Sequence, residues 1–254
     1  MIKSPLKNTQ TNNLSLRTIL EKIPAGSVVD TFALFSGQLE ISLAEYGRFV
    51  CAHTNKYAIF EFWYTIKEEP KRMYDMVTSE GFRFDPAMFE ILQEKWVAYK
   101  DPVVRSALFF MLNQVSDTGQ ISSGKLVPTK FNRVALANLR TFKSPPNLHF
   151  ILDKEEKLVD SINSKLRGDY IVVNAGKFSY NLFEDGKSQA YDTTKINHRD
   201  LKSKFDLKEQ KMILIYQYDK RVVKLFNNFC TMIDKYGRPT QDENLAVEVV
   251  VANF

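Results

Sequence analysis

The chain is poor in the residues that build metal sites and disulfide frameworks. Its 254 residues include two cysteines, Cys51 and Cys230, and three histidines, His53, His149 and His198. Two cysteines cannot form a disulfide framework, and these five residues do not have the spacing of metal ligands, so we expect no metal. We interpret both cysteines as buried thiols of a protein from a reducing compartment.

Long apolar runs are also missing, and with them the signal for a membrane span. Residues 1–5 read Met-Ile-Lys-Ser-Pro, without the apolar core of a signal peptide. We therefore expect no membrane partner and a cytoplasmic protein. The residue usage, rich in Lys, Asn, Ile and Phe, favours a phage or another low-GC source, and a phage origin would place the protein in the host cytoplasm or the virion.

Two common catalytic signatures are absent as well. Residues 122–125 read Ser-Ser-Gly-Lys, but the strand, glycine-rich loop and helix of a nucleotide-binding P-loop do not surround them. The chain has no Gly-x-Ser-x-Gly elbow of a serine hydrolase.

The chain does carry an excess of positive charge and many aromatic side chains. Its formal net charge is +5, its pI is about 9.0, and 13% of its residues are aromatic. A basic balance permits nucleic-acid binding without requiring it, and a few aromatic side chains outside the core could stack on bases. The length allows one α/β domain with an inserted lobe, or two small domains.

Strand and helix patterns alternate along the chain. Residues 27–33 predict a buried strand, 39–47 a helix and 48–53 a second strand, a βαβ unit typical of a parallel sheet. The polar stretches 179–195 and 234–244 predict loops. Further strands are expected at 148–151, 169–173, 212–216 and 245–254, and further helices at 15–23, 55–66, 103–112, 131–142, 154–166, 198–205 and 220–229.

Residues 168–177 form the most informative stretch, a buried strand that ends in a polar turn, where an α/β enzyme keeps its chemistry. Around it the chain resembles Dam-like DNA adenine methyltransferases, which have Asp-Pro-Pro-Tyr, or Asn-Pro-Pro and an aromatic residue, at this turn. Residues 29–37 lie where that family has Glu-Pro-Phe-x-Gly-x-Gly, residues 107–113 resemble its Phe-Leu-Tyr-Leu-Asn helix, and residues 248–254 resemble its closing strand. The shared order and spacing carry the resemblance. The alternative is an unrelated Rossmann-like fold with the same βαβ rhythm.

The resemblance implies an α/β Rossmann-like methyltransferase fold, with a mainly parallel sheet flanked by helices and an inserted helical lobe. It also implies S-adenosylmethionine as the cofactor and adenine in DNA as the substrate. On this basis we divide the chain into a mobile tail (1–14), a methyltransferase-like α/β core (15–66 and 103–254) and an inserted lobe that resembles a target-recognition region (67–102).

The cofactor positions of the family are altered in this chain. Glycines of the family's loop let the backbone approach the cofactor, but here Leu34, Phe35 and Ser36 take their place and only Gly37 remains. We expect the two bulky side chains to fill cofactor space. The acidic residue that would hold the ribose hydroxyls is replaced by His53, which we interpret as a surface histidine. The vestigial cofactor positions are Phe32, Ala33, Gly37 and His53.

The catalytic tetrapeptide has become Asn174, Ala175, Gly176 and Lys177, so no catalytic residue set is intact. By the resemblance, Asn174 could still accept one hydrogen bond from a target amine, whereas Ala175 and Gly176 lose the rigid proline geometry. Lys177 replaces the ring that stacks on a flipped-out base, and its charge would lie near the positive sulfonium. We therefore expect no cofactor unless activity is retained. The alternative is a simple tight turn.

Our first hypothesis is a methyltransferase-like protein that has lost catalysis and binds DNA or a protein that acts on DNA. Phosphate binding would need clustered cations, and Arg133 and Arg140 are spaced to share a helix face. The alternative is an ordinary solvated charged face. The candidate DNA-binding residues are Arg72, Arg83, Lys125, Lys130, Arg133, Arg140 and Lys143.

Two other functions stay open. The chain could be a non-catalytic partner or a structural subunit of a larger assembly, such as a viral particle, or could form a homo-oligomer, with residues 179–195 or 1–14 docking the partner. It could also be an active but divergent adenine methyltransferase, which Asn174, Asp30 and Asp169 favour.

Overall fold

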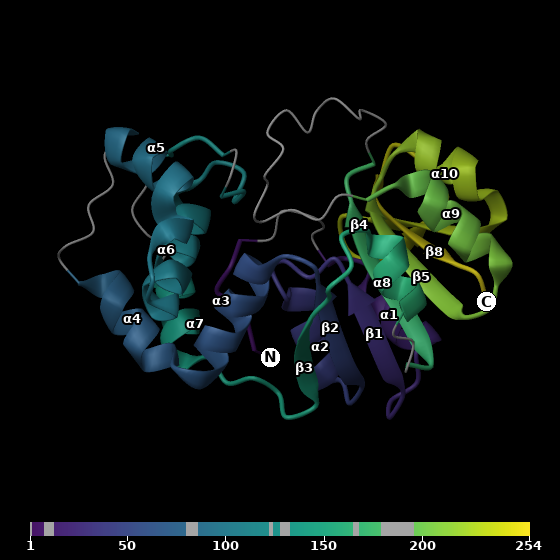
Figure 1. The fold of residues 1–254 in the computed structure, drawn as a ribbon. Helices are drawn as coiled ribbons and strands as arrows, with labels where there is room; N and C mark the ends of the chain where they lie inside the picture. Colours follow the sequence, from purple (N-terminus) through teal and green to yellow (C-terminus); the bar gives the residue numbers. More distant parts are fainter. Residues whose placement is uncertain are drawn as a thin grey trace.

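One eight-stranded sheet organises the protein (Figure 1). The computed structural model describes residues 2–7, 13–79, 86–121, 124–127, 133–164, 168–178 and 196–254. The strands lie in the order β3-β2-β1-β4-β5-β8-β6-β7. They are β1 (Val28–Phe32), β2 (Phe49–Thr54), β3 (Leu148–Leu152), β4 (Tyr170–Gly176), β5 (Lys211–Gln217), β6 (Cys230–Asp234), β7 (Pro239–Thr240) and β8 (Ala246–Ala252).

The first five strands run parallel, and only the last three are joined by antiparallel pairing. Every residue of β4 is buried, as expected for a central strand that is covered on both faces. β8 lies antiparallel between β5 and β6. This arrangement confirms the predicted Rossmann-like α/β fold with a mainly parallel sheet flanked by helices.

Two separate apolar cores cover the two faces of the sheet. Val172 of β4 belongs to the core that includes α1 (Leu16–Lys22), α2 (Gln38–Glu45) and α3 (Tyr57–Glu68). Its neighbours on the strand, Ile171 and Val173, point to the opposite face, because successive side chains of a strand alternate. There they pack with the three helices α8 (Leu158–Ser164), α9 (His198–Leu207) and α10 (Lys220–Phe226).

A helical lobe stands beside the β3 edge of the sheet and is reached through α3 (Figure 1). The buried helix α6 is its centre, with Phe109 and Phe110 fully enclosed. The range 67–102 contains α4, α5 and η1, and these pack together with α3, α6 and α7. The elements of the lobe are α4 (Pro70–Thr78), α5 (Pro86–Lys95), η1 (Trp96–Ala98), α6 (Pro102–Val115) and α7 (Arg133–Thr141).

Residues 2–7 lie between the sheet and this lobe. The backbone N–H of Ser4 donates to Oε1 of Gln38 at 2.9 Å, on α2. The backbone N–H of Lys7 donates to Oδ1 of Asn113 at 2.8 Å, on α6. The segment therefore links the start of α2 to the lobe.

The C-terminal part of the sheet was not predicted fully. β6 and β7 form a hairpin, whereas the sequence predicted no strand between the helix at 220–229 and the polar loop at 234–244. The pairing of β6 with β8 overrides the weak local pattern, because β8 supplies the partner for its backbone groups. Neither cysteine forms a disulfide, and both thiols are half-buried. Among the described residues, no helix is long and apolar enough to cross a membrane, and no group of three or more His, Cys, Asp or Glu could hold a metal ion.

Candidate functional site

The candidate site lies where the strand order reverses. β1 has β2 on one side and β4 on the other, so the chain crosses over β1 between β3 and β4. Open α/β sheets bind ligands outside the carboxyl ends of the strands at such a switch point. The loop after β1 and residues 174–177 at the end of β4 meet there, since Phe32 pairs with Val173.

The loop after β1 buries its own side chains in the core. Ala33 adopts φ +63°, and the backbone N–H of Leu34 donates to the carbonyl of His53 at 3.2 Å. Leu34 and Phe35 are buried, and the ring of Phe35 lies 6.3 Å from that of Phe109 in α6. Both side chains join the core that the sheet shares with the helical lobe.

Gly37 allows this loop to close on a tryptophan. Its φ is +67°, and a Cβ there would lie 2.4 Å from Cζ2 of Trp63. Trp63 is fully buried in α3, and its Nε1–H donates to the carbonyl of Phe35 at 2.9 Å. The glycine is thus needed for the close approach of an indole ring, and the indole holds the loop in place.

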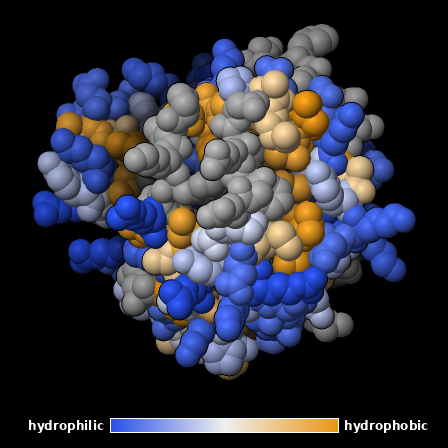
Figure 2. Space-filling view, turned by 90° about the vertical axis from the view of Figure 1, so that its left-hand side faces the viewer, coloured by the Kyte–Doolittle hydropathy of each residue, from blue (hydrophilic) through white to orange (hydrophobic). Residues whose placement is uncertain are grey.

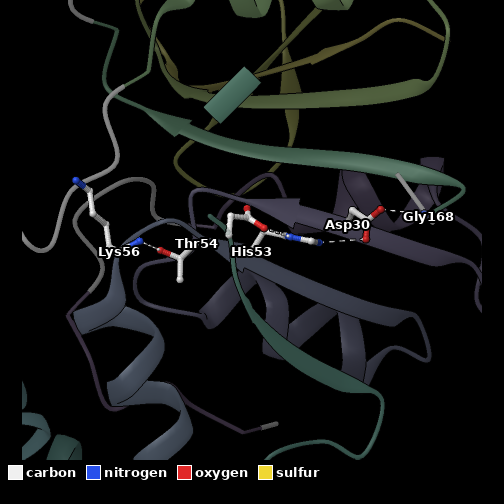
Figure 3. Close-up of polar contacts among 6 residues, drawn as sticks. Asp30, His53, Thr54, Lys56 and Gly168 are labelled. Atoms are coloured by element: carbon white, nitrogen blue, oxygen red, sulfur yellow. Dashed lines mark hydrogen bonds and ion pairs between the residues drawn. The ribbon is translucent and has the colours of Figure 1, made fainter. Parts of the chain in front are cut away.

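His53 is buried, and the prediction that it is a surface residue is wrong. It stands at the end of β2, 2% exposed, and its ring stacks on that of Phe32 at 4.6 Å. Its Nδ1 lies 3.0 Å from Oδ1 of Asp153, and its Nε2 lies 3.4 Å from Oδ1 of Asp30. The other carboxylate oxygen of Asp30 accepts the backbone N–H of Gly168 at 2.9 Å (Figure 3).

This network favours a protonated imidazole. Burial alone lowers the pKa of His53, but hydrogen bonds and charge attraction from Asp153 and Asp30 together raise it above the ordinary 6.5. Ionised carboxylates only accept hydrogen bonds, so both ring nitrogens must donate for both bonds to form, and only the imidazolium has two N–H groups. The middle of β1 and the ends of β2 and β3 therefore place an imidazole between two carboxyl groups.

Asp153 was missed by the sequence reasoning. It follows β3 directly, and its backbone N–H donates to the carbonyl of Thr54 at 2.8 Å, which aligns the two strand ends. The available signal was an acidic residue just past a predicted strand, because His53 pairs with Ile151, two residues before Asp153. The carboxylate expected at the end of β2 is thus replaced by carboxylates on the two flanking strands, and both are engaged by His53.

The altered tetrapeptide lies at the end of β4, as predicted from the strand pattern. Asn174 is 4% exposed, and its Oδ1 has no hydrogen-bond donor within the described part of the chain. Gly176 adopts φ +63° at a break in the register with β5. Lys177 is exposed. Oδ1 of Asn174 could therefore accept a hydrogen bond from a target amine, but Ala175 and Gly176 do not give the rigid backbone of two prolines.

A second buried histidine lies behind this turn. His198, at the start of α9, approaches the hydroxyl of Tyr216 with its Nδ1 at 3.2 Å. The ring of Phe178 covers it at 4.6 Å. Burial lowers the pKa of His198 to about 4 and raises the pKa of Tyr216, so both groups stay neutral near neutral pH. Phe178 and Tyr216 of this cluster belong to the core that covers one face of β4 and β5.

Glu40 is a further buried acid that sequence reasoning missed. It lies in the first turn of α2, just after the closed loop, and is 2% exposed. Burial raises its pKa to about 7, although a hydrogen bond to its own backbone N–H acts in the opposite direction. The helical pattern of that segment gave no signal for it, since α2 is buried on nearly all sides.

The predicted DNA-binding residues do not form a single cluster. Arg72 is bound to Glu69 at 3.0 Å and to Asp101 at 2.9 Å. Lys125 is exposed in the loop after α6. Arg83 and Lys130 lie outside the described residues.

The remaining three candidates lie on or next to α7. Arg133, Arg140 and Lys143 are all exposed. The guanidinium of Arg140 lies 5.4 Å from the centre of the Tyr74 ring, on α4. Within the described residues these three cations have no acidic partner.

No protein family matches the chain, and no curated protein matches it either. Among solved structures it is similar to a TehB-like SAM-dependent methyltransferase from Corynebacterium glutamicum, with 8% sequence identity and a TM-score of 0.32. The match covers 94% of this chain and 85% of that chain. The likeness is confined to the path of the chain and does not carry over the activity of that protein. The strand order described above agrees with the Rossmann-like α/β fold that the sequence predicted.

Proposed function

We propose that this chain is a methyltransferase-like protein that no longer uses S-adenosylmethionine and serves by binding DNA. The buried network of Asp30, His53 and Asp153 is the observation that supports the loss of S-adenosylmethionine use. In a Rossmann-type site a carboxylate at the end of the second strand accepts hydrogen bonds from the ribose hydroxyls. Here an imidazole stands at that position and occupies the carboxylates of both neighbouring strands.

The residues present do not fit the cofactor. His53 contacts the carboxyl groups of both Asp30 and Asp153, so neither carboxyl group is available in full to the ribose hydroxyls of S-adenosylmethionine. The loop that would approach the cofactor is packed against Trp63 through Phe35 and Gly37. We therefore derive no catalytic step for this chain.

The charge distribution along the chain supports the proposal that the protein binds DNA. Residues 118–152 contain five of the chain's 35 Lys and Arg and none of its 30 Asp and Glu, so this segment accounts for the whole formal net charge of +5. An acid-free stretch attracts phosphates without competition from its own carboxylates. The segment includes all of α7, which is exposed along its basic side.

The contact surface that we propose consists of Arg133, Arg140 and Lys143. Arg72 is not part of it, because Glu69 and Asp101 already hold its guanidinium. Tyr74, beside Arg140, adds an aromatic face next to the cations. Cations on phosphates fix the position of a protein on DNA without reading its sequence, so we expect binding without base specificity.

Salt dependence of DNA binding tests this surface. Replacing Arg133, Arg140 and Lys143 together by alanine should reduce the slope of log K against log salt concentration by about 2.7, since each phosphate contact contributes about 0.9. The matched control replaces Lys154, Lys157 and Lys224, which are exposed elsewhere, and changes the net charge equally. Binding of a short duplex should be followed by fluorescence anisotropy. If the two triple variants lose affinity equally, α7 is not the DNA surface.

Loss of catalysis is tested with labelled S-adenosylmethionine and unmethylated duplex DNA. We expect no transfer of label to DNA by the full chain over the time in which an active adenine methyltransferase completes its reaction. Transfer of label above the rate in heat-denatured protein would contradict the proposal and favour the divergent enzyme.

A further inference from the structure

A half-open hollow lies at the helical lobe. Its volume is about 290 Å³, and it is formed by one side of α3 together with the start of α6 at Pro102 and Val103. Sites for drug-sized ligands measure about 300–1,000 Å³, so this hollow has the size for a single long side chain. The lobe side of the molecule shows apolar residues exposed among charged ones (Figure 2).

Aromatic rings form one wall of the hollow. Tyr57, Phe60 and Tyr64 are spaced three, four and seven residues apart, so they share one face of α3. The rings of Phe60 and Tyr64 lie 6.0 Å apart at 25°, in a stacked arrangement. Tyr57 and Tyr64 are 59% and 56% exposed, so their faces are open to a ligand.

Three carboxylates also line the hollow, and Glu68 is the one that no ion pair occupies within the described part of the chain. Glu61 is bound by Arg105, whose Nε donates to Oε2 at 2.7 Å, and Glu69 is bound by Arg72 at 3.0 Å. Glu68 is exposed and has no ion-pair partner among the described residues. It lies one helical turn after Tyr64, so its charge sits beside the aromatic pair. No Lys or Arg is among the residues that line the hollow.

We propose that this hollow binds a Lys or Arg side chain on an exposed segment of a partner protein. Ring faces attract cations through their negative quadrupole, and an adjacent carboxylate adds charge attraction. An anionic or neutral ligand would meet Glu68 without compensation. The site is independent of the proposed DNA surface, because its charge has the opposite sign and it uses α3 and α6 rather than α7.

A peptide titration tests the proposal. The probe is an acetylated and amidated hexapeptide of lysine, titrated into the full chain and followed by the amide shifts of the protein in NMR spectra. We expect Tyr64→Ala to weaken binding about two- to fivefold, the loss for one cation on an exposed ring. Glu68→Gln should weaken it and make it less sensitive to salt, because the free carboxylate is removed.

Matched controls separate this site from general charge effects. Tyr236→Ala removes a tyrosine that is 69% exposed at the opposite end of the sheet, and Glu94→Gln removes an exposed carboxylate on α5. Both should bind the peptide as the wild type does. Equal losses in the control and site variants, or equal binding of a norleucine hexapeptide, would overturn the proposal. Self-association of the chain that Tyr64→Ala abolishes would overturn it too, because the occupant would then be a second copy.

Discussion

Replacing Gly37 by alanine sets a methyl group against the buried ring of Trp63. The added Cβ would lie 2.4 Å from Cζ2 and 2.8 Å from Cη2 of that ring. Trp63 cannot move aside easily, because its Nε1–H is bonded to Phe35 and its ring packs at 5.7 Å from Phe142 and at 5.2 Å from Phe150.

Two effects add in this variant. The left-handed φ of +67° costs about 1–2 kcal/mol for a residue with a Cβ. Overpacking of a filled core costs about 1–3 kcal/mol more. We therefore expect Gly37→Ala to lower the free energy of unfolding by about 2–5 kcal/mol.

Gly26→Ala is the matched control. Gly26 has φ +83°, but nothing lies within 4 Å of its added Cβ, so only the backbone effect of about 1–2 kcal/mol remains. Urea unfolding followed by tryptophan fluorescence gives both losses from the shift of the midpoint at constant slope. A Gly37→Ala loss no larger than the Gly26→Ala loss would refute the packing of Trp63 over the loop after β1.

The remaining predictions concern the two buried histidines and the ion pair of the lobe. The raised pKa of His53 gives stability that is present below pH 6.5 and is lost as the pH rises through the folded pKa; His53→Gln should flatten this fall in urea midpoints above neutral pH. The lowered pKa of His198 has the opposite sign, so stability should fall as the pH drops from 6.5 towards 4, and His198→Phe should remove that acid sensitivity in thermal melts. Arg105→Ala should destabilise the protein more than Arg105→Ala combined with Glu61→Gln, because the single change leaves a buried carboxylate unpaired, and calorimetric melting of both variants checks this order.

The strands that build the site could be predicted because their sequences are short, mostly apolar runs. Residues 27–33, 48–53 and 169–173 gave β1, β2 and β4 within a few residues, and their order along the chain favoured a parallel sheet. Neither the pairing of β8 between β5 and β6 nor the hairpin of β6 and β7 followed from local pattern. Pairing between distant strands depends on the tertiary fold, which single-segment periodicity does not contain.

The chemistry of the site was harder to foresee than its position. The end of β4 was placed by its polar turn, but the burial of His53 depends on Asp30 and Asp153, two residues far from it in sequence. A histidine after a strand has the same local pattern whether it is exposed or held between carboxylates. The closed loop after β1 likewise depends on Trp63, which lies on a different helix. Such contacts are fixed by packing across the sheet.

Calorimetric titration of S-adenosylmethionine into the full chain tests the central claim most directly. The contacts of His53 with Asp30 and Asp153, together with the packed loop after β1, predict no binding in the micromolar range. S-adenosylhomocysteine, which lacks the sulfonium charge, should fail to bind as well, since the ribose contacts are blocked for both. Micromolar binding of S-adenosylmethionine would contradict the account and restore an enzymatic role for Asn174.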